Sequence, residues 1–204
     1  MGRKSLAPER REQILKALET CILEHGLAGS TFGRVAAIAG VQPSVIAHYF
    51  GSKEAVIDAV VERTTQRYRD LFASHVLDRP AGQRLKAALD FLFGDAFAIR
   101  ELEIVMGELI TASHHDDRIR GHIRRMYSEF EQVCRMAVKT AYPSAPPRRS
   151  RDVSYAIMCL ADANATFFGI GFDPDCHDRA RRIAAAMLST LAPETTKQRR
   201  RARR

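Results

Sequence analysis

One stretch of the chain, TFGRVAAIAGVQPSVIAHYFGSK, combines a tight turn with side chains that could contact nucleic acid, and it runs from Thr31 to Lys53. A helix-turn-helix needs one helix packed across a second, which carries small or polar side chains into the major groove of DNA. Gly40 permits the turn, and Val41 should anchor it in the core. The first helix would bury an apolar face made of Val35, Ala36 and Ile38. The motif at residues 31–50 therefore predicts hydrogen bonding to DNA rather than bond breaking.

Catalytic chemistry has no comparable support in the sequence. The chain contains no G-x-S-x-G, H-E-x-x-H, P-loop or dinucleotide-binding pattern, and no cysteine has neighbours that would activate its thiol. We therefore expect neither an enzyme nor a bound cofactor. One cluster does hold residue types that ligate metals: His114, His115, Asp116, Asp117 and His122. Because Asp116 also suits the N-cap of a helix, we expect no metal there.

The charge of the chain favours a polyanionic partner, but much of it lies at one end. The 204 residues are 46% hydrophobic and 27% charged, as in a folded protein, and their formal net charge is +8. Residues 192–204 include six basic residues and one acidic residue, so this segment alone carries +5. We expect it to be a disordered basic tail that either adds non-specific attraction to phosphates or is simply solvated. The case for specific binding must come from the motif.

Nothing in the sequence directs the chain to a membrane or out of the cell. It has no run of about 18 apolar residues, and the start MGRKSLAPERREQ lacks the apolar segment of a secretory signal. We expect a cytoplasmic protein without a membrane partner. Four cysteines lie far apart with no C-x-x-C pair, and we expect them to be mostly buried hydrophobic residues: Cys21, Cys134, Cys159 and Cys176.

The elements that must position the motif are expected to be helices. Apolar residues recur at helical spacing almost throughout, and no segment alternates convincingly with a period of two, so the predicted fold class is all-α. Capping residues, glycines and prolines predict the ends of nine helices. These are Pro8–His25, Phe32–Ala39, Pro43–Tyr49, Lys53–Val76, Ala81–Ile99, Glu101–Ala112, Asp117–Ala141, Arg151–Phe168 and Asp175–Leu191. The composition of residues 143–150, PSAPPRRS, predicts a loop.

The motif also resembles the tetracycline-repressor (TetR) family of regulators. Thirteen positions match the family pattern at fixed spacing: Thr31, Val35, Ala36, Ala39, Gly40, Val41, Ser44, Ile46, Tyr49, Phe50, Ser52, Lys53 and Glu54. The close resemblance covers about residues 8–61, and the rest agrees in length and helix order. Gln42 replaces the usual serine or threonine cap, and Ala47 replaces a common tyrosine, so the DNA sequence that is read cannot be transferred from a relative.

The resemblance implies which residues meet DNA. The groove-facing side of the second helix would carry Gln42, Pro43, Ser44, Val45, Ala47 and His48, with Gly33 close by. Ser44 and His48 could hydrogen-bond base edges, while the apolar members suit a thymine methyl group. Phosphate contacts are expected from Thr31, Arg34, Tyr49 and Lys53. Ile46 and Phe50 should point into the core.

The resemblance further implies a DNA-binding domain at 8–68, a ligand-binding and dimerisation domain at 69–191, and the tail at 192–204. In relatives the last two long helices pair with those of a second copy, and here they carry apolar faces. The expected interface of this homodimer includes Ala156, Leu160, Ile183, Met187 and Leu191. A two-fold dimer would set two recognition helices about one DNA turn apart, which gives a palindromic operator.

A ligand pocket in such a body would be apolar with a few polar groups. The candidate lining residues are Phe91, Phe93, Asp95, Met106, Glu108, Tyr127, Phe130, Asn164, Phe167 and Phe168. The aromatic residues and Met106 also fit an ordinary core. Asn164 lies in an apolar run and needs a polar partner, which the second subunit could also provide.

These observations predict a sequence-specific, DNA-binding transcriptional regulator. The expected form is a repressor that a small-molecule effector releases from double-stranded operator DNA. Two alternatives remain: an activator of the same fold, and an architectural protein that binds DNA without sequence preference.

Overall fold

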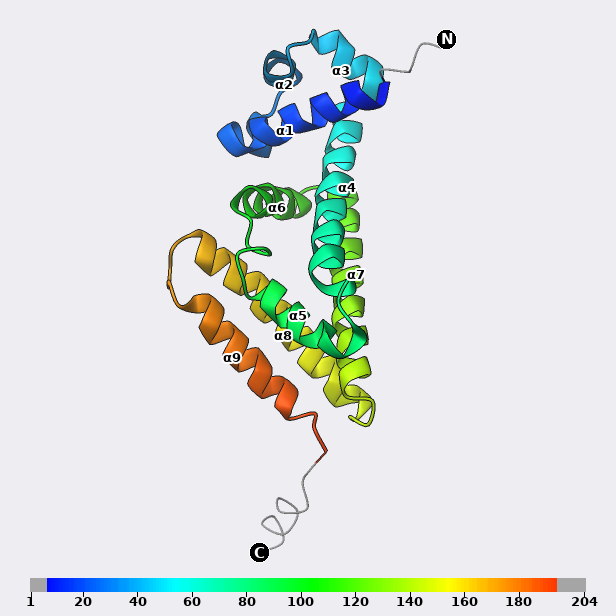
Figure 1. Cartoon of the computed structure of the whole chain (residues 1–204). Coiled ribbons are helices and arrows are strands. Elements are labelled where there is room, and N and C mark those ends of the chain that lie inside the picture. The colour runs from blue at the N-terminus through cyan, green and yellow to red at the C-terminus, as the bar shows by residue number, and fades with distance from the viewer. Residues whose placement is uncertain (1–6, 194–204) are drawn as a thin grey trace, which may run out of the picture. The chain divides into compact units, whose positions relative to one another are not determined.

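The computed structural model describes residues 7–193, and helices alone make up its regular structure (Figure 1). The basic tail predicted at 192–204 lies outside these residues except for its first two. The α-helices are α1 (Ala7–Gly29), α2 (Phe32–Ala39), α3 (Pro43–Phe50), α4 (Lys53–Phe72), α5 (Arg84–Leu92), α6 (Arg100–Ser113), α7 (Asp117–Ala141), α8 (Pro147–Gly169) and α9 (Cys176–Ser189). A π-helical turn, Ala73–Leu77, follows α4, and a short 3-10 helix, Ala81–Gln83, precedes α5. The described part of the chain thus confirms the all-α prediction and its nine helices.

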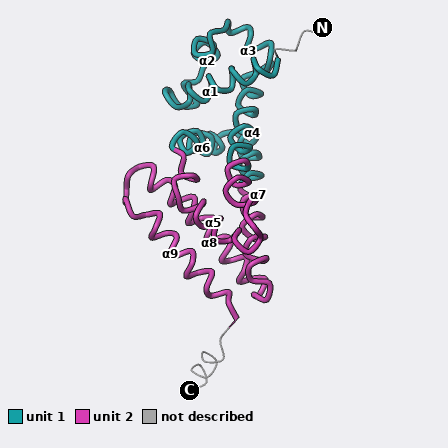
Figure 2. The backbone as a smooth tube through the Cα atoms, in the orientation of Figure 1, with its two compact units in different colours: residues 1–69, 100–126 teal, residues 70–99, 127–204 magenta. Residues whose placement is uncertain are grey.

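The chain divides into two compact units, which Figure 2 colours separately. Unit 1 comprises the residues up to Arg69 together with 100–126, so it contains α1 to α3, most of α4, α6 and the first part of α7. Unit 2 comprises 70–99 and the residues from Tyr127 onward. The helix-turn-helix therefore shares one unit with a helix from the later half of the sequence. No helix within residues 7–193 is both long and apolar enough to cross a membrane.

Unit 1 is organised around α1, which packs against α2, α3 and α6. Its inward face is apolar and fully buried at Ile14, Leu18, Cys21 and Ile22. The helix was predicted to stop at Gly26, and the backbone does break there, with φ 68° and ψ 168°. One further turn follows the break as far as Gly29. The carboxylate of Glu108 on α6 accepts a hydrogen bond from the Leu27 N–H (2.7 Å), a donor that the break leaves without a helical acceptor.

The turn between α2 and α3 depends on a left-handed glycine. Gly40 has φ 62° and ψ 37°, and its N–H bonds back to the carbonyls of Ala36 and Ala37. The Val41 N–H also bonds to the Ala36 carbonyl (3.0 Å), which closes the helix end in the way glycine-terminated helices do. Val41 itself is only half-buried. Most L-amino acids disfavour this backbone conformation, so the sequence position of Gly40 decides where the turn falls.

The buried face of α2 differs from the prediction at one residue. Val35, Ala36 and Ala39 are buried, whereas Ile38, predicted to join them, is 39% exposed. Residues 35, 36 and 39 share one side of an eight-residue helix, and residue 38 lies outside that stripe. The small alanines let α2 lie close to α1.

Unit 2 contains the α8–α9 hairpin, which packs on itself and on α5. A row of aromatic rings lies within the unit: Phe72, His75, Phe91, Phe97 and Phe130. Three of the cysteines are buried as predicted, but Cys159 on α8 is exposed.

Two helix ends in unit 2 depart from the predictions by more than three residues. The helix α8 begins at Pro147 instead of Arg151, because proline at the first helical position lacks only an N–H that would be unpaired there. The predicted loop at 143–150 is therefore shorter. The helix α5 ends at Leu92 rather than continuing to Ile99, since Phe93 leaves helical geometry (φ −117°, ψ 46°).

Replacing Gly40 with alanine should destabilise unit 1 by about 1 kcal/mol, because a side chain is strained in the left-handed region. No atom lies within 4 Å of a Cβ built at Gly40, so the effect isolates backbone strain from steric clash. The matched control is Gly107→Ala, at a helical position of α6 that is equally open and has ordinary helical φ. That change should stabilise by up to about 1 kcal/mol. Urea unfolding followed by circular dichroism measures both, and shifts of the same sign would contradict this account of the turn.

Candidate nucleic-acid interface

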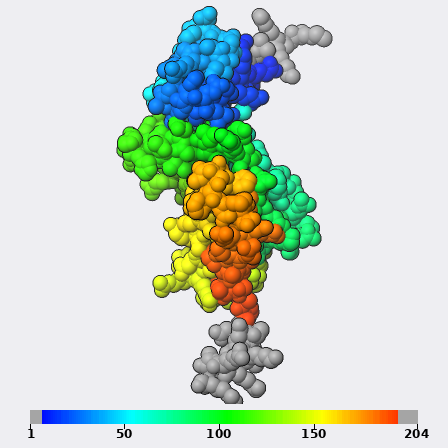
Figure 3. All heavy atoms as spheres, turned by 90° about the vertical axis from the view of Figure 1, so that its left-hand side faces the viewer, coloured from blue at the N-terminus to red at the C-terminus, as the bar shows by residue number. Residues whose placement is uncertain are grey.

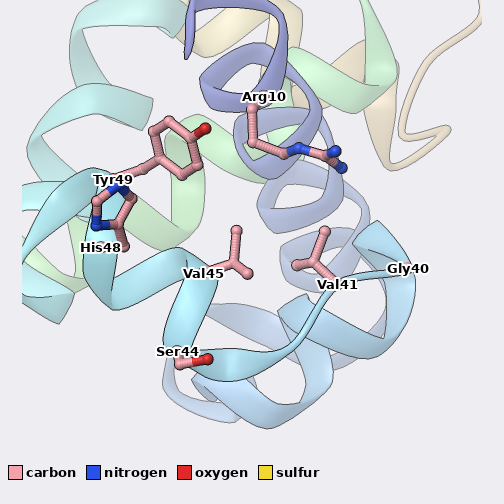
Figure 4. A pocket seen from close by; sticks show the side chains of 7 residues that line it. All are labelled: Arg10, Gly40, Val41, Ser44, Val45, His48 and Tyr49. Atoms are coloured by element: carbon pink, nitrogen blue, oxygen red, sulfur yellow. The ribbon is translucent and has the colours of Figure 1, made fainter. Parts of the chain in front are cut away.

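A hollow of about 530 Å³ lies beside the second helix of the helix-turn-helix (Figure 4). Its lining comes from α1, the turn and α3: Arg10, Gly40, Val41, Ser44, Val45, His48 and Tyr49. Six of these seven residues belong to the predicted motif. The hollow is open to solvent, and its lining combines apolar side chains with hydrogen-bonding groups, both of which can contact base edges in a major groove.

The exposed side of α3 carries the residues predicted to read bases. Ser44 and His48 lie one turn apart and are both exposed, while Ile46 and Phe50 are buried beneath them with exposures of 0% and 8%. Other predicted contacts are also accessible on this helix and at its start: Gln42, Pro43 and Ala47 are exposed, and Val45 is half-buried. One side of α3 is thus buried in the core, and the opposite side is exposed and accessible to a groove.

The start of α3 lacks a side-chain cap. Gln42 occupies the N-cap position and makes no capping hydrogen bond, and Pro43 follows at the first helical position. The N-terminal N–H groups of α3 that remain after Pro43 are therefore not covered by the capping side chain. This agrees with the departure from the family pattern noted at Gln42.

The residues predicted to contact phosphates lie at the start of α2, the end of α3 and the start of α4. Thr31 caps α2 by accepting a hydrogen bond from the Arg34 N–H (3.3 Å), and the Arg34 guanidinium donates to the Gly29 carbonyl (2.8 Å). Gly33 and Lys53 are exposed, and Tyr49 is half-buried at the end of α3. Ser52 caps α4 by accepting a hydrogen bond from the Ala55 N–H (3.2 Å).

Two side chains of α1, which no sequence motif identifies, form hydrogen bonds with the ends of the motif helices. Gln13 donates to the Ala39 carbonyl at the end of α2 (2.6 Å). Arg11 donates to the Tyr49 carbonyl at the end of α3, and its guanidinium carbon lies 4.1 Å from the centre of the Phe50 ring. A cation at a helix C-terminus is favourable because the free carbonyls carry partial negative charge. The polar residues of the first α1 turns gave no motif, so only the tertiary contacts disclose this role.

Ion pairs connect α1 to α4 within unit 1. The Arg63 guanidinium pairs with Glu12 and, at 2.8 Å, with Glu19, while Arg67 lies 3.7 Å from the second oxygen of Glu19. The hydrogen bond from Arg63 holds the pKa of Glu12 below its usual range and raises the pKa of Arg63. These pairs attach the middle of α4 to α1, the helix that also contacts α3.

The polar cluster at the start of α7 forms a helix cap. Asp116 accepts from the N–H groups of Arg118 (2.8 Å) and Ile119 (3.2 Å), and the bond from Ile119 contributes most to lowering the pKa of this carboxyl. Arg118 pairs with Asp58 of α4, and the His122 ring lies 3.0 Å from the same carboxylate. The capping interpretation of Asp116 is therefore confirmed.

The residues predicted to line a ligand pocket are divided between the two units. Met106 and Glu108 belong to unit 1, where Met106 is buried and Glu108 binds the α1 backbone. The other candidates, Phe93 among them, belong to unit 2. There Phe91 and Phe130 both contact the Phe97 ring. Two hollows lie in unit 1, and none of the candidates lines either of them. The pocket remains a prediction.

The polar candidates of unit 2 have partners within that unit. Tyr127 donates to Asp162 (2.8 Å). The buried Asn164 is 2.7 Å from His177 Nδ1, and Asp95 lies 3.5 Å from Nε2 of the same ring. Phe168 stacks on His177 with ring centres 4.1 Å apart, and Phe167 is 45% exposed.

The residues predicted for a dimer interface differ in accessibility. Ile183 is 46% exposed, while Ala156, Leu160 and Met187 are half-buried. Leu191 is only 4% exposed and packs within its own chain. Sequence periodicity on α8 and α9 thus does not separate the side chains used inside the unit from those left at its surface.

Comparisons with known proteins agree on one family. Residues 14–60 match the family described as bacterial regulatory proteins, tetR family. Over 188 residues, 33% are identical to the HTH-type transcriptional regulator BetI of Escherichia coli O17:K52:H18, covering 89% of this chain and 95% of that relative. With BetI of Stenotrophomonas maltophilia, 32% are identical over 98 residues, which cover 47% of this chain and 50% of the relative.

A solved structure shares the fold over nearly the whole chain. It is a transcriptional regulator from Saccharomonospora viridis in complex with choline, with a TM-score of 0.75 and 18% identity. The match covers 89% of this chain and 96% of that one. At this identity the likeness concerns the fold alone.

Proposed function

The chain belongs to the tetR family of bacterial regulatory proteins and is a DNA-binding transcriptional regulator, and on this premise we propose that it represses transcription until a small molecule releases it from a palindromic operator. The observation that carries the proposal is the face of α3, where Ser44 and His48 are exposed above the buried Ile46 and Phe50. A rigid helix with accessible polar groups can read base edges in a major groove. Since the proposed target is operator DNA, we propose that it acts in the cytoplasm.

Replacing Ser44 and His48 together with alanine should lower operator affinity by on the order of 100-fold, because each base contact is worth about 1–3 kcal/mol. Affinity for an unrelated duplex should stay the same. The operator is the duplex that the wild-type chain selects from a random pool, and fluorescence anisotropy measures both affinities.

The matched control replaces His115 and Ser189, which are also exposed, with alanine. This pair should leave both affinities unchanged. If the Ser44 and His48 double variant kept wild-type preference for the operator, α3 would not be the reading helix.

Dimerisation would place two copies of α3 on one operator. An exposed stripe follows α8 at intervals of four residues, comprising Tyr155, Cys159, Ala163 and Phe167. Ile183 on the neighbouring α9 is exposed as well. Contiguous apolar surface of this kind marks interaction sites, and a two-fold pairing of α8 and α9 would cover it. We assign the homodimer interface to this stripe and Ile183.

The substitution Ile183→Glu should convert the dimer to a monomer, since pairing would bury two carboxylates without partners. Sedimentation analysis should give half the wild-type mass, and operator affinity should fall with it. The control is Met136→Glu on α7, which also places a carboxylate at an exposed apolar residue, here 63% exposed. A dimeric Ile183→Glu variant would place the interface elsewhere.

The proposed effector is a small organic cation, for which choline is the first test. The structural relative from Saccharomonospora viridis is in complex with choline. Unit 2 of this chain holds a row of aromatic rings that includes Phe91 and Phe130. The faces of such rings attract quaternary ammonium groups. An effector can weaken operator binding only as far as it binds the released conformation more tightly.

Millimolar choline should lower operator affinity at least tenfold, whereas its neutral isostere 3,3-dimethylbutan-1-ol should act far more weakly because it lacks the cation–π attraction. Anisotropy titrations with each compound measure the difference. Phe130→Leu should reduce the choline response while leaving operator affinity in the absence of choline unchanged. Equal affinities with and without saturating choline would exclude it as the effector.

A further inference from the structure

The hollow beside α3 contains a single lysine or arginine in its lining, and this residue comes from α1 rather than from the motif. It is Arg10, whose side chain extends over the hollow in Figure 4. The same view shows Tyr49 on that side of the hollow, with its hydroxyl group turned toward Arg10. A guanidinium and a hydroxyl, both hydrogen-bond donors, thus border one concave surface.

The direction of the Arg10 side chain is set by a short relay of hydrogen bonds. Arg10 Nη1 donates to Gln13 Oε1 at 2.7 Å, and Gln13 Nε2 donates to the Ala39 carbonyl at 2.6 Å. The second bond determines which end of the Gln13 amide faces Arg10, because only the nitrogen can donate to a carbonyl. The end of α2 therefore holds the guanidinium at the hollow.

The positive charge of Arg10 is not neutralised within residues 7–193. Its hydrogen-bond partner is the neutral Gln13, and no carboxylate of the described chain forms an ion pair with it. A guanidinium has five N–H groups, so four remain for an external acceptor. The next residue, Arg11, differs because its guanidinium donates to the Tyr49 carbonyl and lies over the Phe50 ring.

We propose that Arg10 binds a backbone phosphate of the operator, with the Tyr49 hydroxyl as a second donor to the same phosphate. This inference rests on the proposed function, since α3 must occupy the groove. A guanidinium fork matches the oxygens of a phosphate and forms charge-assisted hydrogen bonds. Gln13 retains Arg10 at the side of α3, where phosphates border the groove, while Ser44 and His48 meet the bases. Arg10 therefore contributes affinity and register rather than sequence preference.

Salt dependence tests this assignment. The full chain, the Arg10→Gln and Arg10→Lys variants, and an Arg149→Gln control are titrated with the selected operator and with an unrelated duplex at several salt concentrations. Arg149 is an exposed arginine of unit 2, so its loss changes the net charge equally. Losing one phosphate contact should reduce the slope of log affinity against log salt by about 0.9.

Arg10→Gln should show this reduced slope and bind both duplexes about fivefold more weakly. Arg10→Lys should keep the wild-type slope, because the charge remains. Arg149→Gln should match wild type. The assignment is overturned if Arg10→Gln keeps the wild-type slope, if it loses operator preference as a base contact would, or if Arg149→Gln behaves in the same way. Wild-type binding without preference between the two duplexes would instead defeat the proposed function.

Discussion

An eight-residue helix has little stability of its own in water, and the function of this protein depends on one such helix keeping its shape. Isolated helices shorter than about 12 residues are marginal, because nucleation costs more than a few hydrogen bonds return. For α3, burial of Ile46 and Phe50 supplies the missing stability. Contact with α1 is therefore the constraint on which the proposed reading of DNA by α3 depends.

The support from α1 is polar as well as apolar. Gln13 and Arg11 donate hydrogen bonds to carbonyls at the ends of α2 and α3. A short helix otherwise leaves these groups to water. The ion pairs of Arg63 attach α4 to the same helix. Since α1 also packs against α6, the reading helix is connected to a helix that follows it by about 50 residues in the sequence.

Predictions from the sequence succeeded where local chemistry was decisive. Gly40 and Pro43 fixed the turn and the start of α3, because few residues tolerate a positive φ and proline suits the first helical turn. The predictions were less successful at deciding which side of a helix is buried. Ile38 was expected inside and lies outside, and Leu191 was expected at a dimer interface and lies within its own chain. Helical periodicity predicts an apolar stripe along a helix, but the packing of neighbouring helices decides which residues of that stripe are buried.

The amino-acid sequence by itself determined the helical fold and the turn at Gly40, because these depend on backbone preference, capping and apolar spacing within a few residues. The residues of α3 that were expected to be exposed came from the resemblance to the TetR family. Only the tertiary structure decided that Glu108 would bind the α1 backbone and that Arg10 would lie over the hollow beside α3. Both outcomes join residues far apart in the chain. A polar side chain at a helix surface carries no local sign of the partner it will meet, because that partner is chosen by the packing of the whole unit.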